Sequence, residues 1–356
     1  MARFNGFTKK QLTNVFTQMV TARELDLKML ILLKQGKSFF HMGCSGHEAS
    51  QLAAALTLKG GSDWFYPYYR DGAFTLALGI TTREHLLSFL ARADDPGSGG
   101  RQMPMHYGNK DLRIVSQSSA TGTQYLQAVG CAISRKLENS KEVVYVSSGE
   151  GTTSQGDFHE ALNWAGREKA PVVFHIQDNE YAISTHRSEQ TAGSVFSLVS
   201  GYENLSKYQV DGTDFFETHL AFKQAVERAR RGKGPSVIVS NVVRLMPHSS
   251  SDDQRKYRTE KSLEDDLKRD PIALFKQFCI NKKIFTETNA NKIENQIKEQ
   301  ISKDIEWADK QSHPPKENAT RYVYSEDKVK LEPKLTKISD NIVMVDAINH
   351  ALHEEM

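Results

Sequence analysis

The sequence predicts an α/β protein with a mostly parallel sheet and helices on both faces. Three short apolar runs have the length and β-branched composition of buried strands, at residues 143–146, 172–176 and 237–243. Helical patterns alternate with these runs, near residues 123–135, 158–167 and 216–231. Alternation of this kind favours parallel pairing, and ligands of parallel sheets bind beyond the carboxyl ends of the strands. A site is therefore expected at that edge.

The first 60 residues are predicted to form a helical packing element. Thr8 and Gln11 have the spacing of a capping box, and the apolar residues that follow mark one face of a helix. Gly36 suggests where this helix stops, because glycine readily takes the backbone conformation that ends a helix.

The rest of the chain changes character several times. Residues 64–109 are rich in aromatic residues and glycines, which predicts long loops around a helix near residues 82–92. From Pro271 to about residue 310 the chain is helical and highly charged, and residues 311–338 form a polar linker. Residues 339–356 carry one more helical pattern, which ends without a glycine cap or a basic last turn.

Composition excludes several classes of protein. Of the 356 residues 38% are hydrophobic, and a net charge of +2 gives no reason to expect a nucleic-acid partner. No uncharged apolar run reaches the ~18 residues of a membrane span, and the first residues lack the core of a signal peptide. No membrane partner is expected, and a cytoplasmic location is the default. Cys44, Cys131 and Cys279 are few and scattered, which is typical of reduced thiols without assigned chemistry.

The run at 143–146 continues into SSGEGTTSQGDFHEALNWA, a glycine-rich turn before a helix. This order predicts a phosphate site, because glycines let the backbone approach an anion and a helix N-terminus offers free N–H groups. The glycines do not form GxGxxG, and Asp157 and Phe158 stand where a P-loop has Lys and Ser or Thr. Neither a nicotinamide fold nor a P-loop nucleotide hydrolase is favoured.

Glu150 lies between the first two glycines of this turn, where a carboxylate would repel a bare phosphate. A cation is therefore expected to join them, and a hard ion such as magnesium prefers oxygen ligands and bridges protein groups to a diphosphate. Asn179, after the run at 172–176, places an amide oxygen and a nearby carbonyl at the end of another strand. Either half alone is more often a plain turn or loop start, but together they favour a metal-bridged diphosphate.

The pair GEG at 149–151 and DN at 178–179 resembles the bipartite signature of enzymes that bind thiamine diphosphate and decarboxylate 2-oxo acids. Further blocks make the resemblance more specific, namely GRQMPMHYG at 100–108, TQYLQAVG at 123–130, YAIST at 181–185 and HSSSDD at 248–253. In this order they resemble the alpha subunit of the decarboxylating component of 2-oxo acid dehydrogenase complexes, in its branched-chain form. The match runs roughly from Leu12 to Asp309, which implies a thiamine diphosphate-binding fold and an alpha-type domain over residues 1–310.

The resemblance implies roles for individual residues. Magnesium would be held by the side chains of Glu150 and Asn179 and by the carbonyl of Tyr181. The cofactor would be contacted by Tyr69, Arg70, Ser119, Thr121, Gly151, Thr152, Gln177 and His248, with His248 as the catalytic residue near the reactive carbon. A structural potassium ion would be held by Ser118, Ala120, Thr123 and Gln124.

The chain departs from the family pattern at three of these positions. Ala120 and Thr121 stand where the family has Pro and Leu, so the aminopyrimidine or substrate pocket is expected to differ. Gln177 stands where branched-chain relatives have an arginine near the phosphates, which puts one phosphate contact in doubt. Glu150 agrees with the branched-chain members, whereas many other relatives have aspartate.

The resemblance also implies the reaction and its partners. A small 2-oxo acid, by preference a branched-chain one, would lose carbon dioxide, and its acyl group would pass to the lipoyl group of a partner transacylase. A beta-type subunit would complete the active site in an alpha2beta2-like assembly. Residues 339–356, NIVMVDAINHALHEEM with the two residues before them, resemble the opening of that subunit, which suggests an alpha–beta fusion of which this chain is the first part.

Two alternatives stay open. A pyruvate or acetoin dehydrogenase of the same family would share almost every residue named above. In a different class, the chain separated from its beta half would be a catalytically silent assembly module.

Overall fold

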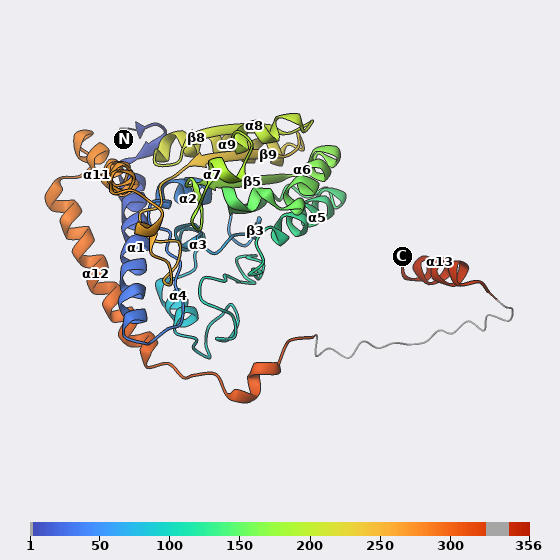
Figure 1. The fold of residues 1–356 in the computed structure, drawn as a ribbon, viewed down its shortest axis with the longest axis horizontal. Helices are drawn as coiled ribbons and strands as arrows, with labels where there is room; N and C mark the ends of the chain where they lie inside the picture. Colours follow the sequence, from blue (N-terminus) through green and yellow to red (C-terminus); the bar gives the residue numbers. More distant parts are fainter. Residues whose placement is uncertain (1–2, 325–341) are drawn as a thin grey trace. The chain divides into compact units, whose positions relative to one another are not determined.

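A five-stranded parallel sheet forms the core of the protein (Figure 1). The computed structural model describes residues 3–324 and 342–356 and orders the strands β3-β4-β5-β9-β8, with every neighbouring pair parallel. The three predicted strands are β4 (Val144–Gly149), β5 (Val172–Asp178) and β9 (Ser236–Asn241). The predicted α/β class with a mostly parallel sheet is confirmed.

The sequence pattern does not predict the two edge strands. β3 (Trp64–Tyr66) has only three residues and lies in the aromatic stretch where loops and one helix are predicted, so that prediction is wrong here. β8 (Ser206–Asp211) is exposed or half-buried along most of its length. Neither edge strand carries the continuous apolar run that marks a strand buried on both faces.

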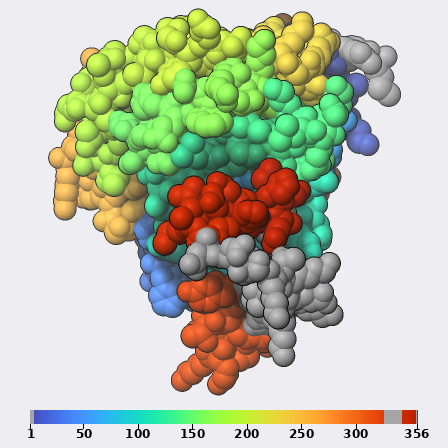
Figure 2. Space-filling view, turned by 90° about the vertical axis from the view of Figure 1, so that its right-hand side faces the viewer, coloured from blue at the N-terminus to red at the C-terminus, as the bar shows by residue number. Residues whose placement is uncertain are grey.

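Side chains along each strand alternate between two hydrophobic cores. Tyr145 lies in the core on one face, whereas its neighbours Val144 and Val146 lie in the core on the other. The helices that complete the two cores are α1 (Lys9–Lys34), α2 (Glu48–Ala55) and α9 (Phe215–Arg230) on the first face and α5 (Thr123–Leu137) and α6 (Gly156–Glu168) on the second. Figure 2 shows the side of the molecule where α5 and α6, teal and green, reach the surface. The predicted helices on both faces are thus present.

The amino-terminal packing element follows its sequence signals. The Thr8 hydroxyl accepts a hydrogen bond from the Gln11 N–H at 3.3 Å, and the Gln11 side chain accepts one from the Thr8 N–H at 2.9 Å, which completes the predicted capping box. Helix α1 ends two residues before Gly36, which has a φ of +72°. In Figure 1, α12 (Glu287–Asp309) runs beside α1, after α11 (Pro271–Asn281).

The remaining elements are short. They are β1 (Arg3–Phe4), β2 (Phe7–Thr8), α3 (Gly72–Leu78), α4 (Thr82–Phe89), the 3₁₀ turn η1 (Glu150–Ser154), β6 (Tyr181–Ala182), β7 (Thr185–His186), α7 (Arg187–Gln190), α8 (Val195–Leu198), η2 (Val199–Gly201), η3 (Gln254–Lys256), α10 (Glu260–Lys268), η4 (Lys316–Thr320) and α13 (Met344–Glu355).

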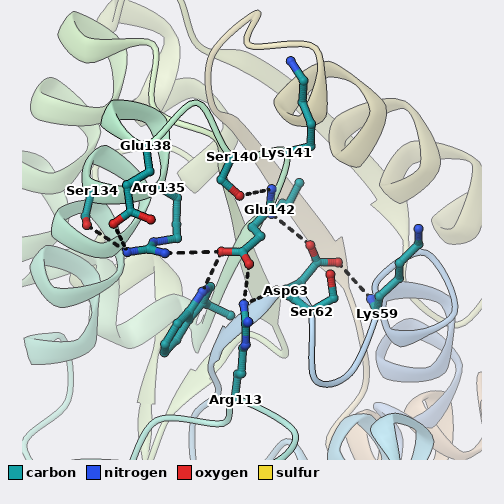
Figure 3. Close-up of polar contacts among 12 residues, drawn as sticks. Lys59, Ser62, Asp63, Arg113, Ser134, Arg135, Glu138, Ser140, Lys141 and Glu142 are labelled. Carbon is teal, nitrogen blue, oxygen red and sulfur yellow. Dashed lines mark hydrogen bonds and ion pairs between the residues drawn. The ribbon is translucent and has the colours of Figure 1, made fainter.

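A polar network ties together the starts of β3 and β4, at the amino end of the sheet (Figure 3). Glu142 accepts hydrogen bonds from Arg113 at 2.5 Å and from the Trp64 indole at 3.1 Å. Asp63 is fully buried, pairs with Arg230 at 2.5 Å and accepts from the Val143 N–H at 2.9 Å. These contacts fix the register of the strands from the end opposite to the expected site.

The chain divides into two compact units, Met1–Pro314 and Pro315–Met356. In the second unit the predicted helical pattern forms α13, whose apolar side chains Val345, Ile348 and Leu352 are more than half exposed. The predicted linker at 311–338 falls partly on residues 325–341, outside the described residues, so the domain boundaries stay a prediction. Within the described residues, no helix has both the length and the hydropathy that crossing a membrane requires.

Candidate active site

A cavity of about 380 Å³ lies at the carboxyl ends of β3, β4 and β5. Its walls come from the segments that follow these strands, from His248 after β9 and from earlier loops. The lining residues are Phe40, Met42, Tyr68, Tyr69, Arg70, Met103, His106, Ser119, Thr121, Gly149, Glu150, Gly151, Thr152, Asn179, Tyr181, Ala182, Ile183 and His248. The structure thus gathers every predicted cofactor and magnesium residue around one space, with the exception of Gln177.

The glycine turn after β4 forms one wall of the cavity. It leads into the 3₁₀ turn η1 before α6 begins. The sequence suggested that the N–H groups beside the cavity belong to the N-terminus of α6, but they belong to η1. A Cβ on Gly151 would lie 2.5 Å from the Cβ of Ala182, closer than two carbon atoms can approach. Glycine is therefore required where the turn passes the segment after β5.

Glu150 is a buried carboxylate with one oxygen that has no partner. Its side chain is 2% exposed, Oε2 accepts from the Asn179 N–H at 3.2 Å, and Oε1 has no hydrogen bond within the described part of the chain. Burial, with the nearby charge of Asp178, raises the pKa of Glu150 to about 7. A buried, unsatisfied carboxylate oxygen is costly, and a bound cation would satisfy it.

The groups around Glu150 suit magnesium better than a metal held by protein side chains alone. Across residues 3–324 and 342–356, no three His, Cys, Asp or Glu side chains cluster as metal ligands. The neighbouring oxygens are the amide of Asn179, which accepts from the Tyr181 N–H at 3.2 Å, and the Tyr181 carbonyl, 3.4 Å from Arg244 Nη1. One carboxylate beside neutral oxygens leaves positions for ligand phosphates, as magnesium sites in proteins commonly do. The residues present therefore fit the metal.

Two buried guanidinium groups make this region positive. Arg70 is 2% exposed and Arg244 is 1% exposed, and within the described residues neither forms an ion pair with a carboxylate. Arg70 donates to the Gly43 carbonyl at 2.6 Å, and Arg244 donates to the Ile183 carbonyl at 3.0 Å. Burial and the charge of Arg70 lower the pKa of Arg244, whose Nε has no hydrogen-bond partner within the described part of the chain. Buried cations that form no direct ion pair, as these two within the described residues, favour a bound anion.

His248 is held at the cavity by Arg70, which follows β3, and by Asp252 of its own loop. Arg70 Nη2 donates to the His248 carbonyl at 3.1 Å and lies 3.4 Å from its Nδ1, and the His248 N–H donates to Asp252 at 2.7 Å. Burial, followed by the charges of Arg70 and Arg244, lowers the pKa of His248 to about 3. The ring is therefore neutral at physiological pH.

A loop that lines the cavity carries two further predicted contacts. Ser119 and Thr121 lie in an exposed loop, and the Ser119 hydroxyl is 2.6 Å from Nε2 of His106. His106 is 7% exposed, and its Nδ1 lies 3.2 Å from the Pro104 carbonyl. Tyr69 completes this region: its ring lies 5.4 Å from the Arg70 guanidinium and edge-on to His248.

Gln177 is not brought to the cavity. Its side chain is fully buried behind the cavity wall, where Oε1 is 2.8 Å from His47 Nδ1 and 2.9 Å from Gln51 Nε2. Its Nε2 donates to Asp71 at 2.6 Å. The structure therefore does not place Gln177 where its cofactor contact is expected, because its side chain points into the protein, where Oε1 has two partners and Nε2 has one.

The expected potassium residues lie in one turn before α5. The Thr123 hydroxyl donates to the Ala120 carbonyl at 3.0 Å, and the Ser118 hydroxyl accepts from the Ala120 N–H at 3.2 Å. Gln124 accepts from the Gly122 N–H at 3.0 Å. These oxygens share a turn and each already has one partner, so a potassium site stays a prediction.

Sequence reasoning missed several residues of this site. Arg244 and His47 carry no local signal of their own, because each takes its place through contacts with distant segments. Tyr68 is 3% exposed, lines the cavity, and has a hydroxyl without a partner in the described chain. The aromatic stretch around Tyr68 and the MPMHYG block were the signals that could have included Tyr68 and His106.

Comparison with known proteins agrees with this geometry. The chain matches the family described as dehydrogenase E1 component over residues 17–317. It is 37% identical over 321 residues to the 2-oxoisovalerate dehydrogenase subunit alpha of Bacillus subtilis, covering 90% of this chain and 97% of that protein. It is 35% identical over 303 residues to a pyruvate dehydrogenase E1 component subunit alpha of Staphylococcus aureus, covering 85% and 79% of the two chains. The corresponding pyruvate dehydrogenase subunit of Bacillus subtilis is 34% identical over 320 residues, or 90% and 82%. The chain therefore belongs to the dehydrogenase E1 component family, as an alpha-type member.

Proposed function

We propose that this chain is the alpha-type part of an enzyme that oxidatively decarboxylates a 2-oxo acid with thiamine diphosphate and magnesium. The observation that carries the proposal is the charge arrangement around one cavity. Within the described residues, one oxygen of buried Glu150 has no hydrogen-bond partner, and buried Arg70 of the cavity lining and buried Arg244 nearby form no ion pair with a carboxylate. A site that needs both a cation and an anion suits a metal-bound diphosphate. The names of the relatives support the reaction class.

In this proposal the cavity residues hold the phosphate end of the cofactor. Glu150, Asn179 and the Tyr181 carbonyl bind magnesium, and the N–H groups of Gly151 and Thr152 face the diphosphate. Thiamine diphosphate supplies the carbon nucleophile and the electron sink for the loss of carbon dioxide. The chain's own residues bind and orient it.

Tyr69, Arg70, Ser119 and Thr121 are proposed as further cofactor contacts. Arg70 suits the diphosphate because a guanidinium can donate two parallel hydrogen bonds to phosphate oxygens. The turn of Ser118, Ala120, Thr123 and Gln124 is proposed to bind potassium, which would stiffen the loop that carries these contacts.

His248 is proposed as the catalytic residue for transfer of the acyl group to a lipoyl arm. An anion bound in the cavity beside Arg70 offsets part of the positive charge near His248, so it raises the pKa of His248 from about 3 toward its ordinary range. The imidazole can then hold or donate a proton at the lipoyl sulfur. The main-chain bond from Arg70 to His248 keeps the ring at the cavity.

The proposed substrate is a small 2-oxo acid, with a branched-chain acid preferred. Phe40, Met42, Met103 and Ile183 give the cavity an apolar wall that can receive an aliphatic side chain. Pyruvate or acetoin is the alternative, because the Staphylococcus aureus relative is named for pyruvate.

A panel of 2-oxo acids with an artificial electron acceptor tests the substrate and the reaction. We expect a higher kcat/KM for 3-methyl-2-oxobutanoate than for pyruvate, because added methyl groups gain apolar contact worth about 1–3 kcal/mol each. Preference for pyruvate would overturn the branched-chain choice, and no turnover of any 2-oxo acid by the assembled enzyme would overturn the reaction class.

Partners are proposed from the family and from the second unit of the chain. A beta-type subunit or domain completes the active site in an alpha2beta2-like assembly, and a lipoyl-bearing transacylase accepts the acyl group. The exposed apolar side chains of α13 support the proposal that residues 339–356 open a beta-type domain. A cytoplasmic location is proposed on composition alone. If the chain is instead a silent assembly module, it folds and assembles without binding cofactor.

A further inference from the structure

A buried chain of hydrogen bonds ends on the proposed magnesium ligand Asn179. His47, which precedes the first turn of α2, is fully buried and does not line the cavity. Its Nδ1 lies 2.8 Å from Gln177 Oε1, and its Nε2 lies 3.4 Å from Asn179 Nδ2. The role inferred below for these hydrogen bonds rests on the proposed function, because it concerns the metal that Asn179 would hold.

The direction of the hydrogen bonds is set by the backbone of α3. The N–H groups of Ala73 and Phe74 donate to Gln51 Oε1 at 3.0 and 3.3 Å. A backbone N–H can only donate, so this atom of Gln51 is the oxygen and the other is the NH₂ group. That NH₂ group donates to the Arg70 carbonyl at 3.0 Å and to Gln177 Oε1 at 2.9 Å. The atom of Gln177 that faces Gln51 must therefore be an acceptor.

The same oxygen of Gln177 determines the tautomer of His47. Because Gln177 Oε1 can only accept, the proton between it and His47 belongs to Nδ1 of the ring. Asp71 agrees with this assignment from the other side, since it accepts from Gln177 Nε2 at 2.6 Å. A neutral ring with its proton on Nδ1 has a lone pair on Nε2.

The lone pair of His47 in turn orients the amide of Asn179. Only the NH₂ group of Asn179 can donate to Nε2, so the amide oxygen faces away from His47. The Tyr181 N–H donates to that oxygen at 3.2 Å, which gives the same orientation independently. The amide oxygen keeps a second lone pair for a metal ion.

We propose that His47 is a positioning residue that presents the Asn179 oxygen to the metal, and that Gln177 sets the tautomer of His47. An arginine at position 177 has only donors, so it could not accept from either Gln51 or His47. This role explains why the side chain of Gln177 is satisfied inside the protein and does not reach the cavity.

The tautomer can be measured without metal or cofactor. In the full chain labelled with ¹⁵N-histidine at pH 7.5, the His47 signals are identified by their loss in His47→Gln. We expect a protonated Nδ1 and an unprotonated Nε2. A proton on Nε2 would overturn the proposal whatever the protein binds, so this result is independent of the proposed function.

Two substitutions of His47 separate positioning from packing. Asparagine places an amide at the position of Nδ1 and loses the contact with Asn179, whereas glutamine places its amide oxygen near Nε2 and keeps that contact. With thiamine diphosphate at saturation, Mn²⁺ binding is measured by electron paramagnetic resonance. We expect His47→Asn to weaken Mn²⁺ binding by about 10–100-fold, as loss of a group that orients a metal ligand does, and His47→Gln to stay within about threefold.

Thermal unfolding of both variants without metal completes the test. Equal losses of Mn²⁺ affinity in the two variants, in step with equal losses of stability, would show that His47 only packs and would overturn the proposal. Unchanged Mn²⁺ binding in His47→Asn would overturn it as well. Failure of the unsubstituted protein to bind Mn²⁺ with thiamine diphosphate would instead overturn the proposed function, and the histidine spectrum would still report the tautomer.

Discussion

Glu150 shows how a single residue can specify a cofactor. Glycines and a helical turn specify only an anion, and a carboxylate among them is unfavourable unless a cation is shared. In the structure Glu150 is buried, with one oxygen left without a partner in the described chain. We therefore propose that the residue that looks misplaced in the sequence is the one that makes the site selective for a metal-bound diphosphate.

Ionised Glu150 lowers the stability of the metal-free fold, which gives a prediction about how stability changes with pH. Its pKa rises from an ordinary 4.5 to about 7 in the fold. Between these values the folded state holds a proton that the unfolded state has lost, so the stability of metal-free protein falls as pH rises from 4.5 to 7 and stays lower above it. We expect Glu150→Gln to be more stable than the unsubstituted protein at pH 8 by on the order of 3 kcal/mol, and nearly equal at pH 4.5.

Urea unfolding in the presence of a chelator measures this difference. Asp71, whose pKa burial also raises to about 7, contributes the same pH dependence to both proteins and cancels in the comparison. A variant less stable than the unsubstituted protein at pH 8, or a difference that does not change with pH, would contradict the account of Glu150.

A second prediction concerns a single residue, His248. In the assembled enzyme we expect His248→Ala to bind thiamine diphosphate within about threefold of normal, because Arg70 contacts the His248 main chain as well as the ring. Lipoyl acylation should fall by about 10²–10⁴-fold, as for loss of a general acid. His159→Ala is the matched control, since His159 pairs with Tyr202 away from the cavity. An unchanged acylation rate would remove His248 from the reaction.

Site residues divide into those that sequence reveals and those that only the fold reveals. Glu150, Asn179, Arg70 and His248 lie in short motifs after strands, and all four line the cavity. Arg244 lies in no such motif. It follows β9 and donates a hydrogen bond to the carbonyl of Ile183, 61 residues away in the chain. Its buried position depends on the packing of two loops, which no local pattern encodes.

Among the elements, the glycine turn after β4 shapes the cavity because it packs closely against the segment after β5. Gly151 has an ordinary backbone conformation, so its requirement comes from the 2.5 Å approach to Ala182 and not from φ. We expect Gly151→Ala to push the turn from the segment after β5 and to weaken cofactor binding by at least about tenfold, roughly 1.4 kcal/mol.

Gly156→Ala serves as the control for this prediction. A Cβ there has its nearest contact at 3.9 Å, and the residue begins α6. We therefore expect unchanged cofactor binding and unchanged or slightly higher stability, because alanine is the better helix former. Calorimetric titration of thiamine diphosphate compares the two variants. Equal affinities would show that the close approach of the turn is not needed.

The amino end of the sheet carries a separate prediction about stability. Asp63 is fully buried and pairs with Arg230, so Asp63→Asn leaves the guanidinium without its charge partner. We expect a loss of about 3 kcal/mol in urea unfolding, with cofactor affinity unchanged because the network lies opposite the cavity. Asp265→Asn breaks the exposed pair with Lys268 and should cost less than about 1 kcal/mol. Equal costs for the two substitutions would contradict the structural role of the network.

The central elements of the fold are predictable from sequence, and its edges are not. β4, β5 and β9 are continuous apolar runs because both of their faces are covered, and α1 has a complete capping box. β3 is three residues long and β8 is half-exposed, so neither gives a periodic signal. Their place in the sheet is decided by pairing with β4 and β9.

For the whole molecule, the described residues provide only the phosphate side of a proposed active site. The cavity holds groups for a metal and a diphosphate, and its apolar wall is formed by Phe40, Met42, Met103 and Ile183. A beta-type partner is proposed to cover the remainder. We therefore propose that this chain determines metal and phosphate binding, whereas turnover requires the assembled enzyme.

Titration of thiamine diphosphate, with Mg²⁺ and with a chelator, tests the central claim most directly. It is carried out on the full chain and on the chain assembled with a beta-type subunit. We predict saturable binding in the assembled enzyme that requires Mg²⁺ and is lost in Glu150→Gln. Binding of equal strength in the chelator, or no binding by the assembled enzyme with Mg²⁺ present, would contradict the account.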